Sequence, residues 1–169
     1  MKFIFAGIRK EALLASKYFF EIDSIYTVKN SRVHSYAKKK KIKFFLVNKK
    51  NRSKIFMKMK KNKCKVIFSA GFPYIFPKYT LNSFKIKINS HPSLLPKNKG
   101  VSPIKEVFYS NKNKIGVTLH IMTNKVDSGK IIYQDYIYKQ KISLKKIYQL
   151  VFKYLEPLVV IKGIQKILK

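Results

Sequence analysis

The sequence predicts a Rossmann-like α/β domain, in which a doubly wound, mostly parallel sheet carries helices on both faces. Two observations lead to this fold class. Apolar runs of strand length alternate with stretches at helical spacing over residues 2–70. Such alternation indicates parallel strands with right-handed crossovers, because a tight turn cannot join parallel neighbours. The length of 169 residues corresponds to one domain, so we expect residues 1–169 to form a single unit.

The first part of the chain repeats a strand, a turn and a helix. The opening run "KFIFA" meets Gly7, and the segment after it carries Ala12, Leu13 and Leu14 at mixed helical spacing. The same cycle then recurs along the chain. We expect strands over 2–6, 24–28, 43–47 and 65–70, and helices over 10–20, 31–40 and 52–62.

An aromatic segment with two prolines, "GFPYIFPKYTLNSF", separates this repeat from the next strand. Residues 85–90, "KIKINS", alternate lysine with apolar residues, which predicts a strand with one solvated face. Pro92 ends that strand. Ser102 at a possible N-cap and Pro103 at the first helical position then predict a helix over 102–111.

The last third of the chain predicts a hairpin and a long helix. Residues 115–124 place apolar side chains at 117, 119 and 121 on one strand face, and "KIIYQDYIY" reads as the antiparallel partner after the turn "VDSG". Apolar residues at three-and-four spacing predict a helix over 144–168. We expect Pro157 to kink or split this helix, because proline lacks the backbone N–H.

Composition limits the class of protein. One cysteine, Cys64, excludes an internal disulfide, and neither a signal peptide nor an apolar run long enough to cross a membrane is found. We therefore expect a soluble, cytoplasmic monomer. The net charge of +31 suits a polyanionic partner such as RNA. Nearly all of it comes from lysine rather than arginine, which A/T-rich coding also explains.

Two polar side chains, Asn89 and His91, stand at the end of the strand over 85–90. As residues i and i+2 they leave the same face, so they can converge on one atom. In open α/β sheets ligands bind beyond the carboxyl ends of strands, which is where Pro92 places this pair. The sequence offers no dinucleotide-binding glycine motif, no phosphate loop and no metal-ligand spacing.

The chemistry that fits these residues is acyl transfer to an amine. Asn89 can donate a hydrogen bond to an oxyanion, and His91 can donate a second one or relay a proton. Asp127, in the hairpin turn, is the chosen acid, although Asp-Ser-Gly is also a good turn on backbone grounds alone. We expect His34 and His120 to be structural, with His120 nearer the site.

The stretches "NSHPSLLPKNKG" and "GVTLHIMTNKVDSG" resemble the signatures of the folate-dependent formyltransferases. The resemblance implies a formyltransferase fold, 10-formyltetrahydrofolate as formyl donor, and catalysis by Asn89, His91 and Asp127. It further implies that the turn after His91 contacts the folate and that the loop "SAGFPYIFP" lies against the pterin. The folate-binding residues expected on this basis are Ser93, Leu94, Leu95, Pro96, Phe72 and Tyr74.

The acceptor amine is the remaining question. "FIFAG" and "GVSPI" are similar to the methionyl-tRNA formyltransferases, which implies initiator methionyl-tRNA as partner. Those enzymes carry a carboxyl-terminal barrel domain and a longer basic loop, and this sequence shows neither. A small amine, such as glycinamide ribonucleotide or an amino-sugar nucleotide, stays open. So does a basic RNA-binding module without catalysis.

Overall fold

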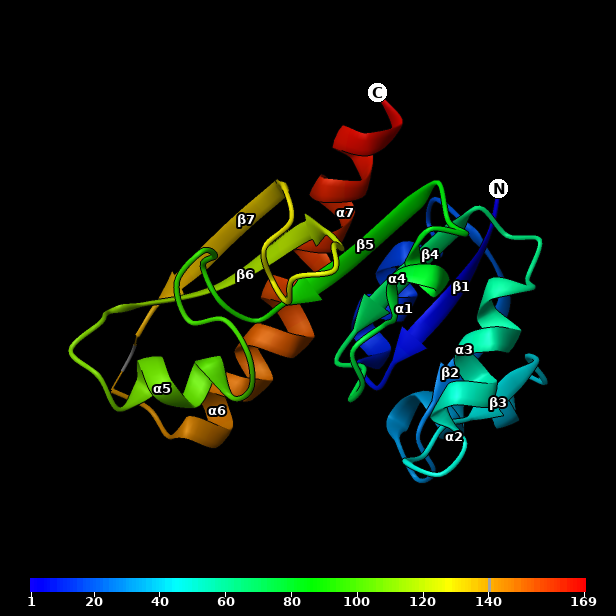
Figure 1. Cartoon of the computed structure of the whole chain (residues 1–169). Helices are drawn as coiled ribbons and strands as arrows, with labels where there is room; N and C mark the ends of the chain where they lie inside the picture. Colours follow the sequence, from blue (N-terminus) through cyan, green and yellow to red (C-terminus); the bar gives the residue numbers. More distant parts are fainter. Residues whose placement is uncertain (140) are drawn as a thin grey trace.

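The computed structural model describes residues 1–139 and 141–169. A seven-stranded sheet of order β3-β2-β1-β4-β5-β6-β7 forms its centre (Figure 1). The strands are β1 (Lys2–Gly7), β2 (Glu21–Thr27), β3 (Phe44–Leu46), β4 (Val66–Ala70), β5 (Ile86–His91), β6 (Lys114–Ile121) and β7 (Ile131–Tyr138). Pairing is parallel from β3 to β5 and antiparallel from β5 through β6 to β7. The predicted fold class and the hairpin are confirmed.

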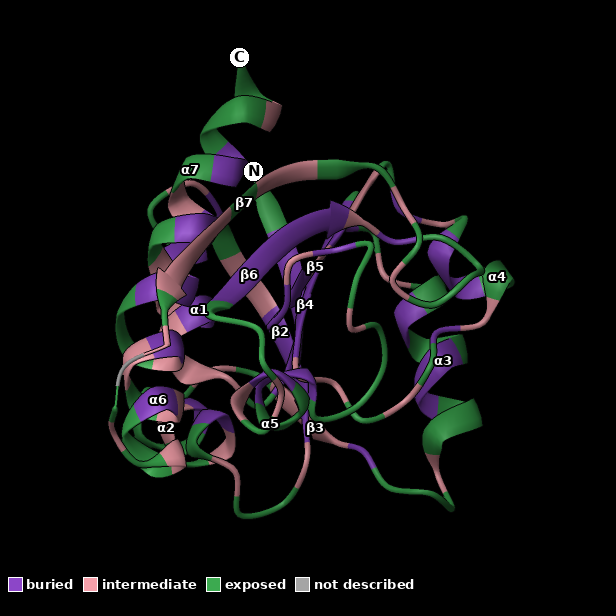
Figure 2. Cartoon of the chain, turned by 90° about the vertical axis from the view of Figure 1, so that its left-hand side faces the viewer, coloured by how far each residue is buried: buried purple, intermediate pink, exposed green. Residues whose placement is uncertain are grey.

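Helices cover both faces of the sheet, and Figure 2 shows the buried strands between two helical layers. The helical elements are α1 (Lys10–Ser16), α2 (Arg32–Lys39), α3 (Arg52–Lys60), α4 (Lys78–Leu81), α5 (Pro103–Phe108), α6 (Leu144–Leu150), a π-helical turn η1 (Val151–Leu155) and α7 (Glu156–Leu168). One apolar cluster joins the sheet to α1, α2 and α5 to α7, and a second joins it to α3 and α4. The two clusters use alternate residues of β1 and β4, as the period of a strand requires.

Several elements differ from the sequence prediction: β2 begins at Glu21 rather than at residue 24, and α5 ends at Phe108 rather than at residue 111. Helix α1 ends at Ser16 rather than at residue 20. Phe20 instead leads into β2 and packs on Phe3, with 5.7 Å between ring centroids, so burial of its ring outweighs the helical spacing. The short helix α4 follows Pro77 and was not predicted, since four residues are too few for a periodic signal.

Strand β5 is a central strand, contrary to the expected single solvated face. Its Lys87 is only partly exposed, and the strand becomes buried towards Ser90 and His91. The lysine pattern therefore describes only its amino-terminal half. At the other end, β4 and β6 flank the strand, and Ser90 and His91 are buried.

The carboxyl-terminal helical run widens into η1 immediately before Pro157. In a regular α-helix the N–H of residue 157 would bond to the carbonyl of Lys153, and proline has no such N–H. The wider turn absorbs this break, so the predicted kink takes the form of a π turn between α6 and α7. Within residues 1–139 and 141–169, no helix is long and apolar enough to cross a membrane.

Candidate active site

A cavity of about 610 Å³ opens where the carboxyl ends of β1, β4 and β5 meet. Strand order reverses on either side of β1, and such a reversal is where open α/β sheets bind ligands. The loop after β4 forms one wall, and the loops that follow β5 and β6 form the other. The cavity lining includes Asn89, His91 and Asp127, as expected from the sequence.

Antiparallel pairing of β5 with β6 sets the position of Asn89. In this register Asn89 lies opposite His120, and His91 lies opposite Thr118. The side-chain amide Nδ2 of Asn89 lies 3.1 Å from Nε2 of His120. Nδ1 of His120 lies 2.9 Å from the carbonyl oxygen of Ile121, and Nε2 faces both Asn89 and Asp127.

His91 is nearly enclosed, with 5% of its surface exposed. Its Nε2 donates to the carbonyl oxygen of Asn98 at 3.0 Å, and its Nδ1 lies 3.3 Å from Oδ2 of Asp127. Burial lowers the pKa of His91 and outweighs the opposing effects of the Asn98 carbonyl and the Asp127 carboxylate. Because neutral imidazole is favoured, Nδ1 and the facing carboxylate can both accept a proton.

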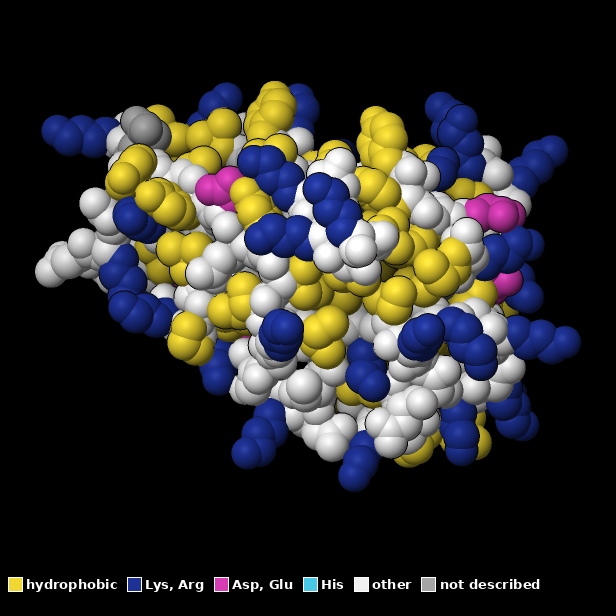
Figure 3. Space-filling view, turned by 90° about the horizontal axis from the view of Figure 1, so that it is seen from above, with side chains coloured by type: hydrophobic (Ala, Val, Ile, Leu, Met, Phe, Trp, Pro, Cys, Tyr) yellow, Lys and Arg dark blue, Asp and Glu magenta, His cyan; other side chains and the backbone are white. Residues whose placement is uncertain are grey.

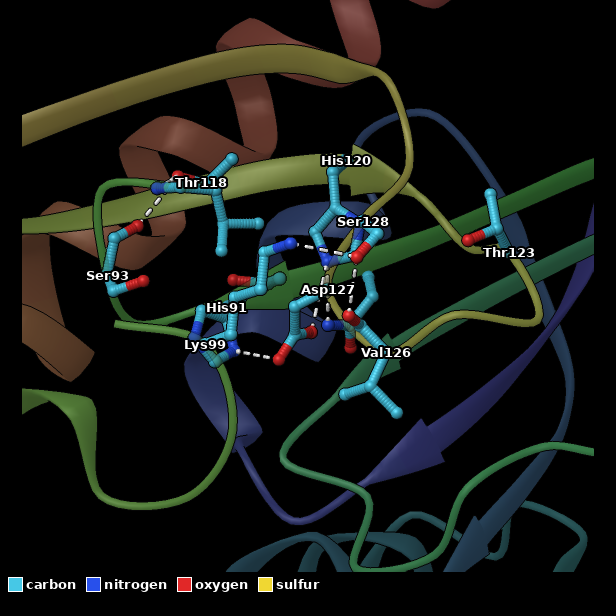
Figure 4. Close-up of polar contacts among 12 residues, drawn as sticks. His91, Ser93, Lys99, Thr118, His120, Thr123, Val126, Asp127 and Ser128 are labelled. Carbon is cyan, nitrogen blue, oxygen red and sulfur yellow. Dashed lines mark hydrogen bonds and ion pairs between the residues drawn. The ribbon is translucent and has the colours of Figure 1, made fainter. Parts of the chain in front are cut away.

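Asp127 joins the two histidines (Figure 4). Its Oδ1 lies 3.5 Å from Nε2 of His120, and its Oδ2 also accepts a hydrogen bond from the N–H of Gly100 at 3.1 Å. Burial alone would raise its pKa, but the contacts with His120, Gly100 and His91 together lower it. The carboxylate is therefore ionised at neutral pH in a site where only 10% of the side chain is exposed.

His120 lies nearer the site than His34, as expected, and is part of the cavity lining itself. His120 is buried, lines the cavity and contacts both Asn89 and Asp127. Sequence alternation placed it on the same face as Thr118, but only the register of β5 against β6 brings it opposite Asn89. His34 lies on α2, outside the cavity lining, where it packs on the ring of Phe44.

The turn after His91 also differs from expectation. The four residues expected to contact folate do not line the cavity: Ser93, Leu94, Leu95 and Pro96. Thr118 Oγ1 donates to the carbonyl of Ser93 at 2.6 Å and accepts from the N–H of Leu95 at 3.2 Å. Leu95 is buried, so its side chain packs into the protein rather than facing the cavity. In the turn, Ser93 Oγ donates to the carbonyl oxygen of Lys97 at 3.0 Å, next to the Asn98 carbonyl that His91 contacts.

Gly116 explains how this turn can lie so close to β6. A Cβ atom at Gly116 would lie 2.4 Å from Cγ of Leu94. Glycine leaves room for the Leu94 side chain over the strand, and any larger residue would have to displace that side chain.

The loop after β4 supplies the expected aromatic wall. Phe72 and Tyr74 both line the cavity, and so does Ile75. Phe72 stacks on Phe76 with 4.9 Å between centroids, and Tyr74 lies edge-on to Phe72 at 5.8 Å. These contacts hold the two rings at the cavity, where they offer an apolar surface to a flat ligand.

Comparison with known proteins agrees with this geometry. A protein-family model described as formyl transferase matches residues 23–151. The methionyl-tRNA formyltransferase of Buchnera aphidicola subsp. Baizongia pistaciae is 30% identical over 109 residues, which are 64% of this chain and 34% of that protein. The trifunctional purine biosynthetic protein adenosine-3 of Chironomus tentans is 41% identical over 73 residues, 43% of this chain and 5% of that protein. Either match spans a minor part of the relative's own length.

Solved structures share the fold. The phosphoribosylglycinamide formyltransferase of Bacillus halodurans superposes with a TM-score of 0.86 at 21% identity, covering 99% of this chain and 95% of that chain. At this identity the likeness concerns the arrangement of strands and helices.

Proposed function

Because the chain belongs to the formyl transferase family, we propose that it transfers a formyl group from 10-formyltetrahydrofolate to an amine bound in the cavity at the end of β5. One observation carries the proposal: the side chains of Asn89, His91 and Asp127, from a strand end and a distant turn, meet in a single cavity. An amide donor, an imidazole and a carboxylate are the groups that acyl transfer between amines needs.

The reaction begins with attack by a neutral amine. Its lone pair forms a bond to the formyl carbon, and the formyl oxygen becomes an oxyanion. The Asn89 amide supplies a hydrogen bond to that oxyanion. The attacking nitrogen gives its proton to the His91 and Asp127 pair, which returns a proton to the folate nitrogen as the old carbon–nitrogen bond breaks.

The geometry favours proton relay over oxyanion binding for His91. Both of its ring nitrogens already face partners, the Asn98 carbonyl and the Asp127 carboxylate. A carboxylate beside Nδ1 stabilises the imidazolium that forms when His91 takes the proton. Of the two roles considered from the sequence, the relay is the one we assign.

The folate is proposed to lie against the loop after β4. Phe72 and Tyr74 offer apolar walls there, and backbone groups of the loop can read the donor and acceptor pattern of the pterin. Ser93 to Pro96 would then act indirectly, by supporting His91, rather than by touching folate.

For the acceptor we propose initiator methionyl-tRNA. Methionyl-tRNA formyltransferases are among the relatives, and this chain carries a net charge of +31. Lysine and arginine side chains project from all around the face drawn in Figure 3, which suits non-specific attraction of a large polyanion. The turn after β1 holds Arg9 and Lys10, with no glycine- and serine-rich phosphate turn.

Glycinamide ribonucleotide is the second candidate. The observation that favours it is the match to the purine biosynthetic protein, which is the higher of the two identities given above. The structural neighbour named for phosphoribosylglycinamide covers almost the whole chain, yet its likeness concerns the fold.

The deciding experiment measures release of tetrahydrofolate with each acceptor in turn. The purified chain is mixed with 10-formyltetrahydrofolate and with methionyl initiator tRNA, glycinamide ribonucleotide or an amino-sugar nucleotide, with His91→Ala as control. Release with the tRNA only, abolished in the variant, supports the proposal. Release with a small amine only changes the acceptor. RNA binding without release in any arm favours a binding module.

A further inference from the structure

A buried ion pair lies directly behind the end of β5. Glu156, the first residue of α7, is fully buried, and 16% of the Arg9 side chain is exposed. Oε1 of Glu156 accepts a hydrogen bond from Nη1 of Arg9 at 2.7 Å and another from Oγ of Ser90 at 2.6 Å. Oε2 of Glu156 has no hydrogen-bond partner among the described residues. The carboxylate therefore depends on one arginine and one serine.

Arg9 links this pair to the cavity. It follows β1 and lines the cavity wall, while its guanidinium lies 4.6 Å from the ring centroid of Phe152 in η1. Its Nη1 also donates to the backbone carbonyl of Ser90 at 3.3 Å. Glu156 thus holds the side chain of Ser90, and Arg9 holds its carbonyl group.

Ser90 is the residue between Asn89 and His91. Successive side chains of a strand point to opposite faces, so the Ser90 hydroxyl points to Glu156 in α7 while the side chains of Asn89 and His91 point the other way; all three residues border the cavity. A shift of Ser90 moves both neighbours. Misplacement of a reacting group by 1 Å can cost about 100-fold in rate.

Stability alone does not account for the pair. Desolvation of two charges is costly, and apolar residues of similar size replace such pairs with little loss or even a gain. A role in holding Ser90, which lies between Asn89 and His91, explains the presence of the pair better.

We propose that Arg9 and Glu156 are positioning residues for formyl transfer, which fix Ser90 and thereby the Asn89 amide and the His91 ring. This inference rests on the proposed function. It predicts that an uncharged, well-packed replacement keeps the fold and the folate site but loses catalytic rate.

The charge of Arg9 also reaches His91. The groups that act on the His91 ring are the Asn98 carbonyl, the Asp127 carboxylate, His120 and Arg9. Burial is the largest cause of the lowered pKa of His91, and the Arg9 cation lowers it further. Arg9 therefore helps to keep His91 neutral and able to take a proton.

The test is the double variant Arg9→Met/Glu156→Leu, compared with Arg32→Met/Glu11→Leu. The control pair has the same residue types, but Arg32 is largely exposed and neither residue lines the cavity. Unfolding temperature, binding of 5-formyltetrahydrofolate, kcat and KM are measured for each. We expect the Arg9 and Glu156 variant to unfold within about 4 °C of the wild type and to bind the folate equally well.

Its kcat should fall about 10- to 100-fold with little change in KM for the donor, while the control keeps the wild-type kcat. Wild-type kcat in the double variant would overturn the inference. Should the double variant not fold, Ser90→Ala replaces it, because it removes the hydrogen bond from Ser90 Oγ to Glu156 and leaves the Arg9 and Glu156 pair in place. A lower kcat at unchanged donor KM is again the supporting result.

A wild-type chain that transfers no formyl group would refute the proposed function, and the positioning role is then decided by NMR spectra of the Asn89 side-chain amide and the His91 ring. Both sets of resonances should shift in the Arg9→Met/Glu156→Leu variant and stay unchanged in the Arg32→Met/Glu11→Leu control, because only the first loses the contacts that fix Ser90. Unchanged resonances in the first variant would contradict the inference.

Discussion

The two faces of β5 differ most at its carboxyl end. On the cavity face, Asn89, His91, His120 and Asp127 lie 3.1 to 3.5 Å apart, and their ring nitrogens and carboxylate oxygens can exchange protons. On the helix face, Ser90 is fixed to Glu156 at 2.6 Å and Glu156 to Arg9 at 2.7 Å in a closed environment. The polar contacts on the cavity face are longer than those on the helix face behind it.

The largest expected effect comes from breaking the helix face with Arg9→Met alone. This change leaves Glu156 buried without its counter-ion, which costs about 3–5 kcal/mol in the free energy of unfolding. Urea denaturation of Arg9→Met and of Arg9→Met/Glu156→Leu measures the loss and its recovery. If the single variant is as stable as the double variant, Glu156 does not need Arg9 as its counter-ion.

On the cavity face, Asn89→Ala should reduce the rate of formyl transfer strongly and the free energy of unfolding only slightly. The change removes the proposed oxyanion donor, so the rate of formyl transfer should fall about 100-fold. The free energy of unfolding should change by only about 1 kcal/mol, since one hydrogen bond to His120 is lost. Single-turnover kinetics and urea denaturation of the same preparation check both numbers. A stability loss as large as that of Arg9→Met would remove the contrast between the faces.

The smallest effect is in the pH dependence. The pKa of His91 is lowered, so the folded protein resists protonation at a pH where the unfolded chain already binds the proton. The contribution of His91 to the free energy of unfolding therefore has its full value above about pH 6.5, and it decreases as the pH falls from there through the pKa of His91 in the folded protein. Activity should follow with an acid limb below pH 6.5.

Asp127→Asn tests this limb. The Asp127 carboxylate raises the pKa of His91, so removing its charge should move the acid limb to still lower pH. The pH profile of kcat/KM for both proteins gives the comparison. A limb that moves to higher pH would show that His91 is not the titrating group.

Sequence reasoning found the part of the site that depends on local geometry. Asn89 and His91 are two residues apart on a strand, and Asp127 lies in a turn whose composition is visible in the sequence. His120 was missed as a site residue because its place depends on how β6 pairs with β5. The pair of Arg9 and Glu156 was missed because 147 positions separate them and no periodic pattern links them.

The same reasoning predicted the strands but not the path of the turn after His91. Strand periodicity is a property of each segment, so the order of strands and helices followed from it. The direction of the turn at Ser93 to Pro96 depends instead on the space above Gly116 and on the hydroxyl of Thr118. Neither is visible until the hairpin is packed against β5.

The link between Arg9 and Glu156 also has a consequence for biosynthesis. Arg9 leaves the ribosome early, and its carboxylate partner follows 147 positions later. At a synthesis rate of about 5–20 residues per second, that interval lasts about 7 to 30 s. The end of β5 cannot be fixed from behind until α7 has been made, so a nascent chain carries the residues of the site well before it can hold them in register.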